Sequence, residues 1–223
     1  MSIEENLLRI KSTIPANVSL IAVSKTHPAD VVMEAYNAGQ RVFGENKVQE
    51  LVGKASEMPD DIEWHMIGHL QSNKVKYIAP FVSLIHGVDS FKLLKVIDKE
   101  AAKNNRIIPC LLQVHIASEE TKFGFSPEEL KLALQTGEHH QYKNVDIRGL
   151  MGMATFTEDE SVIRSEFKML KLLFNELKDS YFKDAVSFRE VSMGMSDDYQ
   201  IAIEEGTTMV RVGSAIFGLR HYT

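Results

Sequence analysis

The sequence predicts a (β/α)8 barrel (a TIM barrel) with one extra helix at its N-terminus. Short β-rich runs alternate with longer helical patterns along the 223 residues, and this alternation indicates a parallel sheet covered by helices. Eight strand–helix units are counted. About 200–250 residues is a common length for a closed eight-stranded barrel that folds as one unit.

Each expected strand is a short run rich in aliphatic and β-branched residues. Leu20-Ile21-Ala22-Val23 in the first strand is continuously apolar, which is typical of strands that are covered on both faces. The expected strands are residues 18–23, 41–43, 63–67, 83–87, 107–116, 146–151, 188–191 and 209–212.

Helical patterns separate these strands. The N-terminal segment carries Ile3, Leu7 and Ile10 on one side, as in an amphipathic helix. Pro127 stands at a helix start, where its missing N–H costs nothing. The helices expected between strands are residues 28–38, 47–57, 72–78, 90–104, 127–135, 159–179 and 197–205.

The domain organisation is expected to be simple. No linker, low-complexity stretch or break in composition divides the chain, so we expect one domain over residues 1–223, with only a short tail after the last strand. An open, doubly wound sheet is the alternative architecture. The first strand is not followed by a glycine-rich dinucleotide fingerprint, which argues against that alternative.

Composition narrows the classes of function. Hydrophobic residues make up 44% of the chain and charged residues 25%, as in ordinary globular domains. The net charge is −6 and no basic run occurs, which argues against a nucleic-acid partner because such binding needs a basic face.

The cysteine content and the targeting signals indicate the cellular compartment in which the protein is expected. Cys110, the only cysteine, cannot form an internal disulfide and is expected to be a buried thiol in a reducing compartment. Neither a secretory leader nor an apolar stretch of roughly 18 residues is found, so we expect no membrane span and a cytoplasmic protein. His139-His140 lies in an expected polar loop without flanking ligands, so no metal site is expected.

A lysine follows the first expected strand, in Val23-Ser24-Lys25-Thr26-His27-Pro28. Ligands of parallel barrels bind at the C-terminal ends of the strands, so Lys25 can point into the mouth of the barrel. Burial there lowers the pKa of the ammonium, which leaves more neutral amine to attack an aldehyde. A solvated surface lysine is the alternative interpretation.

Small residues follow the last two strands. Ser192-Met193-Gly194-Met195-Ser196-Asp197 comes after the seventh strand, and Arg211-Val212-Gly213-Ser214 closes the eighth. Such turns leave backbone N–H groups for a phosphate, and many barrels bind phosphate there. A tight turn at Gly213-Ser214 and a helix N-cap at Ser196 or Asp197 are the alternatives.

Seven groups of residues run in order over nearly the whole chain. They are Val23-Ser24-Lys25-Thr26; Phe43-Gly44-Glu45-Asn46 with Gln49-Glu50; Trp64-His65-Met66-Ile67-Gly68 with Leu70-Gln71 and Asn73-Lys74; Thr121-Lys122-Phe123-Gly124; Gly149-Leu150-Met151-Gly152-Met153; Ser192-Met193-Gly194-Met195-Ser196; and Arg211-Val212-Gly213. Together they resemble the pyridoxal phosphate homeostasis protein family, which in turn resembles the N-terminal barrel domain of alanine racemase.

The resemblance implies roles for particular residues. Lys25 would carry the cofactor, pyridoxal 5′-phosphate (PLP), as a Schiff base. His27 and His115 stand where other residues are expected in relatives. Ser192, Gly213 and Ser214 would hold the phosphate, and Arg211 would face the pyridine nitrogen. Asn46 and Met193 would line the pocket, and His65 would sit near its wall. Lys122 matches a lysine that is implicated in cofactor traffic in the family.

The arginine bears on activity. Arg211 does not lose its proton at ordinary pH, so it favours an unprotonated pyridine nitrogen and a weaker electron sink. Transamination and decarboxylation are therefore not expected. Racemisation needs a second base opposite Lys25, and no further domain is expected after Thr223 to supply it.

We therefore expect a non-catalytic, monomeric PLP-binding protein of vitamin B6 homeostasis. It would store and protect the cofactor and deliver it to apo forms of PLP-dependent enzymes. A PLP-dependent amino-acid racemase is the alternative, and a plain protein-interaction scaffold without a cofactor is a third hypothesis.

Overall fold

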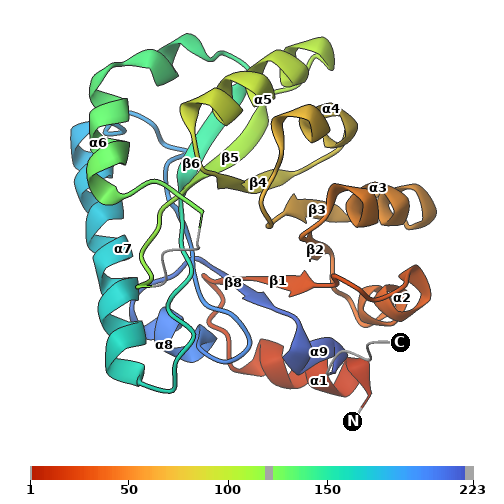
Figure 1. The fold of residues 1–223 in the computed structure, drawn as a ribbon. Coiled ribbons are helices and arrows are strands. Elements are labelled where there is room, and N and C mark those ends of the chain that lie inside the picture. Colours follow the sequence, from red (N-terminus) through yellow and green to blue (C-terminus); the bar gives the residue numbers. More distant parts are fainter. Residues whose placement is uncertain (1, 119–122, 219–223) are drawn as a thin grey trace.

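The predicted barrel is confirmed. In the computed structural model, which describes residues 2–118 and 123–218, eight parallel strands close in chain order, and β8 pairs with β1 (Figure 1). The helices lie around the outside of the strands. No helix in these two ranges has the length and apolar character needed to cross a membrane.

The strands agree closely with the sequence prediction. They are β1 (Ser19–Val23), β2 (Val42–Glu45), β3 (Glu63–Met66), β4 (Leu84–Val88), β5 (Ile108–Gln113), β6 (Val145–Met151), β7 (Glu190–Ser192) and β8 (Met209–Val212).

The α-helices and two short 3-10 helices, η1 and η2, connect them. They are α1 (Ile3–Ser12), α2 (Ala29–Asn37), α3 (Val48–Glu57), η1 (Ser72–Lys74), α4 (Val75–Ile78), α5 (Phe91–Lys103), α6 (Pro127–Gln135), η2 (Glu138–Gln141), α7 (Glu160–Ser180), α8 (Tyr199–Glu204) and α9 (Ser214–Phe217).

Local signals set several helix starts. Ser2 and Glu5 form a capping box on α1, in which each side chain accepts from the other residue's backbone N–H. Ser126 and Glu129 do the same for α6, whose first residue is Pro127. The extra N-terminal helix is thus confirmed, and it lies beside α9 (Figure 1).

Two expectations for connecting segments were wrong. The last strand is followed by the short helix α9 rather than by a plain tail, because Gly213 O accepts from the N–H groups of Ile216 and Phe217. His139 is not in an open polar loop: it lies in η2, buried against Phe91 and Phe182.

The apolar core has two parts. The larger cluster packs the helices against the outer face of the sheet. The smaller one lies inside the barrel and closes it below the C-terminal ends of the strands; it comprises Ile21, Leu84, Leu111, Met151 and Met209. Cys110 is buried, as expected, and burial raises the pKa of its thiol.

Candidate functional site

A cavity of about 250 Å³ opens at the C-terminal ends of the strands. This is the end at which parallel barrels bind their ligands. Its lining comes from the ends of β1 and β8 and from the segments that follow β1, β2, β3, β6, β7 and β8: Val23, Lys25, His27, Asn46, Ile67, Met153, Phe156, Met195, Ser196, Asp197, Arg211, Gly213, Ser214 and Gly218.

The turn that carries Lys25 has an unusual backbone. Lys25 is half-buried, and the next residue, Thr26, has a φ of 68°. A β-branched residue in this left-handed region is strained, and such strain persists only where the surroundings impose it. Here the Thr26 N–H donates to Glu50 Oε2 at 2.7 Å, and His27 N–H donates to Ser24 O at 3.1 Å. The turn is therefore held in a defined shape.

A buried ionic group supports this turn from below. Ser24 Oγ donates to Glu45 Oε1, and Lys54 Nζ donates both to that carboxylate oxygen and to the Ser24 carbonyl. Burial raises the pKa of Glu45, and the Lys54 ammonium opposes the rise. Sequence reasoning missed this group, although a glutamate ending a strand beside a helical lysine was a usable signal.

The turns after β7 and β8 meet on the other side of β1, since β8 pairs with β1 in the closed barrel. Gly213 N–H donates to Ser196 Oγ at 3.1 Å, which joins the two turns directly. A Cβ atom on Gly213 would lie only 3.0 Å from Val23 O. Within the described ranges, the backbone N–H groups of Ser196 and Ser214 donate to no other residue. These hydroxyl and amide donors, with room kept open by a glycine, suit a phosphate group.

Arg211 forms the floor of the cavity. Its Nη1 donates to Ser192 Oγ at 2.6 Å and its Nη2 donates to Gly152 O at 3.0 Å. Burial lowers the pKa of Arg211 to about 10, although Asp198 opposes this shift. Arg211 is therefore still a cation at neutral pH, and it has further N–H groups that can face a ligand.

Five of the seven cofactor residues inferred from the sequence line this one cavity. They are Lys25, Asn46, Arg211, Gly213 and Ser214. His27 also lines it, whereas Lys122 lies outside the described residues, and His115 is not part of the lining.

The other two residues lie elsewhere. Ser192 is fully buried inside the barrel beneath Arg211, and Met193 is fully buried in the core between sheet and helices. Alternate residues of a strand face opposite sides, so neighbours at the end of β7 separate in this way. Met195 and Ser196, from the same sequence motif, reach the cavity instead. His65 lies inside the barrel rather than in the cavity wall.

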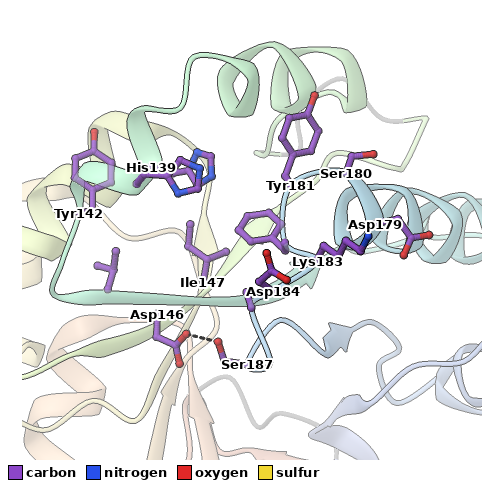
Figure 2. Close-up of a pocket in the computed structure, with 14 residues that line it drawn as sticks. His139, Tyr142, Asp146, Ile147, Asp179, Ser180, Tyr181, Lys183, Asp184 and Ser187 are labelled. Carbon is purple, nitrogen blue, oxygen red and sulfur yellow. Dashed lines mark hydrogen bonds between the residues drawn. The ribbon is translucent and has the colours of Figure 1, made fainter.

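A larger pocket of about 650 Å³ lies at the opposite, N-terminal end of the strands (Figure 2). Asp146 at the start of β6 accepts a 2.7 Å hydrogen bond from Ser187 there. The pocket contains none of the residues inferred for the cofactor, so it is not the candidate site. In residues 2–118 and 123–218, no three His, Cys, Asp or Glu side chains are grouped so as to hold a metal ion.

Comparison with known proteins agrees with this geometry. The family model of the alanine racemase N-terminal domain matches residues 1–221. A pyridoxal phosphate homeostasis protein of Aquifex aeolicus is 43% identical over 204 residues, which cover 91% of this chain and 87% of that protein. A protein of the same name from Pseudomonas aeruginosa is 37% identical, covering 99% and 97%.

Solved structures give the same result. PipY of Synechococcus elongatus, solved with PLP bound, is 38% identical, with a TM-score of 0.88 and coverage of 97% of this chain and 100% of that chain. The structure of PipY without PLP has a TM-score of 0.91. Alanine racemase from Bartonella henselae, at 16% identity and a TM-score of 0.70, shares the fold; the match covers 99% of this chain and 60% of the racemase chain.

Proposed function

This chain belongs to the pyridoxal phosphate homeostasis protein family, and we propose that it binds PLP in the cavity at the C-terminal ends of the strands. One observation carries the proposal: an amine, a buried guanidinium and a set of hydroxyl and amide donors surround a single cavity of about 250 Å³. PLP offers an aldehyde, a pyridine nitrogen and a phosphate, one for each of these groups.

Lys25 is the residue that would hold the aldehyde. Its amine would bind the aldehyde carbon through a C=N bond, with the carbonyl oxygen lost as water. When bound, the cofactor supplies an electron-withdrawing ring and a reactive carbon. Ser196, Gly213 and Ser214 would hold the phosphate, with Ser196 taking the place that the sequence suggested for Ser192.

Arg211 and Asn46 complete the proposed site. Arg211 is a donor only, so it would hold a pyridine nitrogen in its unprotonated form. Asn46 follows β2 on the same side as Lys25 and would line the edge of the ring. Met193, which does not reach the cavity, has no part in this arrangement.

The test is uptake of the cofactor by the purified protein. We expect added PLP to give a visible absorbance band that borohydride reduces irreversibly, with the mass of the adduct on the peptide that contains Lys25. Lys25→Ala is expected to lose both signals, whereas Lys47→Ala, a change of an exposed lysine nearby, should keep them. A wild-type protein that takes up no PLP would refute the proposal.

We further propose a non-catalytic role in PLP homeostasis, in which a single-domain, monomeric, cytoplasmic protein stores PLP and delivers it to apo-enzymes. The support is the family name of the relatives and the weak electron sink that Arg211 would impose. Loaded wild-type protein should activate an apo-enzyme faster than an equal concentration of free PLP mixed with the Lys25→Ala variant. No transfer above free exchange would count against delivery.

An amino-acid racemase is the second candidate, because the Lys25 and Arg211 pair stands on a barrel that alanine racemases share. Incubation with single amino acids in deuterium oxide distinguishes the two functions. Lys25-dependent incorporation of deuterium at the α-carbon, sustained over many turnovers, would favour the racemase.

A further inference from the structure

A continuous chain of hydrogen bonds crosses the interior of the barrel below the cavity. Arg211 Nη1 donates to Ser192 Oγ at 2.6 Å, His86 Nδ1 lies 2.9 Å from the same oxygen, and His86 Nε2 lies 3.0 Å from His65 Nδ1. These four residues come from β8, β7, β4 and β3. Since β4 and β7 are not neighbours in the closed barrel, the bond between them must pass through its centre.

This polar layer is unusual for its place. Interiors of such barrels are mostly filled by branched apolar side chains, and the layer beneath follows that rule. Leu84 and Met209 precede His86 and Arg211 by two residues on the same strands, and both belong to the small interior apolar cluster. Buried polar groups are costly unless they are hydrogen-bonded, so the four side chains depend on one another.

The direction of the first bond in this series is determined: Arg211 can only donate, so Ser192 Oγ is its acceptor. His86 Nδ1 pairs with the same oxygen, as donor or as acceptor according to the tautomer of the ring. Burial lowers the pKa of His65 to about 3 and that of His86 well below its usual value, so both rings are neutral at pH 7. Each neutral ring carries one hydrogen, and one of the two rings donates it across the contact between His86 Nε2 and His65 Nδ1.

This series of hydrogen bonds holds the Arg211 guanidinium from below the cavity. Ser192 Oγ and Gly152 O accept from two different nitrogens of Arg211, which sets the plane of the group and leaves its other N–H groups for the cavity. We propose that Ser192, supported by His86 and His65, is a positioning residue that holds Arg211 as a donor to the ring nitrogen of PLP. This inference rests on the proposed function.

The experiment is a double-mutant cycle on PLP binding. Ser192→Ala removes the acceptor of Arg211 Nη1, and we expect a shift in the absorbance maximum of the bound cofactor and about a tenfold rise in its Kd, which corresponds to about 1.4 kcal/mol. Borohydride trapping on Lys25 should persist. In an Arg211→Ala background the further effect of Ser192→Ala should vanish, because the serine acts through the arginine.

Two more variants keep the test sound if Ser192→Ala folds poorly. His86→Leu cannot hydrogen-bond to Ser192 and should reproduce the spectral shift, whereas His86→Gln, which offers both a donor and an acceptor, should restore at least part of the wild-type spectrum. His139→Ala is the matched control: it removes a buried histidine at the opposite end of the barrel and should leave spectrum and Kd unchanged.

The outcomes separate this inference from the proposed function. If the wild-type protein takes up no PLP, the proposed function fails. If wild-type and Lys25→Ala proteins behave as expected but Ser192→Ala and His86→Leu keep the wild-type spectrum and Kd, only the positioning role fails. A full Ser192→Ala effect in the absence of Arg211 would also overturn that role.

Discussion

Ser24 and Glu45 are joined by a 2.6 Å hydrogen bond from the Ser24 hydroxyl to Glu45 Oε1, inside the wall between β1 and β2. The bond lies one residue before Lys25, so it anchors the start of the turn that carries the amine. Lys54 Nζ completes the anchor with bonds of 2.5 Å to the carboxylate and 2.7 Å to the Ser24 carbonyl. The position of Lys25 thus depends on a charge pair outside the cavity.

Glu45→Gln is expected to destabilise the protein by about 3 kcal/mol, because it leaves the buried Lys54 ammonium without its counter-charge. Urea unfolding of the free protein measures this. Glu45→Gln/Lys54→Met, which removes both charges, should recover most of the loss. Equal stabilities of the single and double variants would contradict the ion-pair interpretation.

Gly213→Ala is expected to weaken PLP binding at least tenfold. Gly213 lies in the turn that would receive the phosphate, and the Cβ atom of an alanine there would lie 3.0 Å from Val23 O and 3.2 Å from Val23 Cβ. The measurement is Kd by absorbance titration. Gly53→Ala is the matched control: nothing lies within 4 Å of its Cβ, and alanine in α3 should stabilise the protein by about 1 kcal/mol. Unchanged binding by Gly213→Ala would remove this turn from the site.

Ser196→Ala should also raise the Kd for PLP by about tenfold, since it removes a hydroxyl in the cavity and the acceptor of Gly213 N–H. Inorganic phosphate should compete with PLP less well in this variant than in the wild type. Ser165→Ala, on the surface of α7, serves as the control. Wild-type affinity in Ser196→Ala would mean that the phosphate lies elsewhere.

Stability should fall as pH is lowered from 7.5 to 5. His65 and His86 have folded-state pKa values below the unfolded value near 6.5, so the unfolded chain binds more protons in this range. For His65, stability is complete above pH 6.5 and is lost towards its folded pKa of about 3. The loss from His65 amounts to about 2 kcal/mol at pH 5, and His86 acts in the same direction.

Urea unfolding at several pH values, with and without His65→Gln/His86→Gln, isolates this contribution. Carboxylates such as Glu45, whose raised pKa acts in the opposite direction, are common to both proteins and cancel in the difference. Parallel pH dependences in the two proteins would show that the histidines are already protonated or exposed.

The sequence alone determined the barrel and the segments that form its site. The spacing of apolar runs and helical patterns depends on neighbours in the chain, and this spacing is enough to place Lys25, Asn46 and Arg211 at strand ends. Burial of Cys110 and the start of α6 at Pro127 follow from equally local properties.

Only the tertiary structure decided which side chain of each segment meets the cavity. A shift of one residue at the end of β7 sends Met193 into the outer core and Ser192 into the barrel, and it is Ser196, four residues later, that reaches the cavity. The hydrogen bond of His86 to Ser192 joins β4 to β7 across the interior of the closed barrel. Sequence spacing does not encode such contacts, because they depend on how the strands are staggered around the axis.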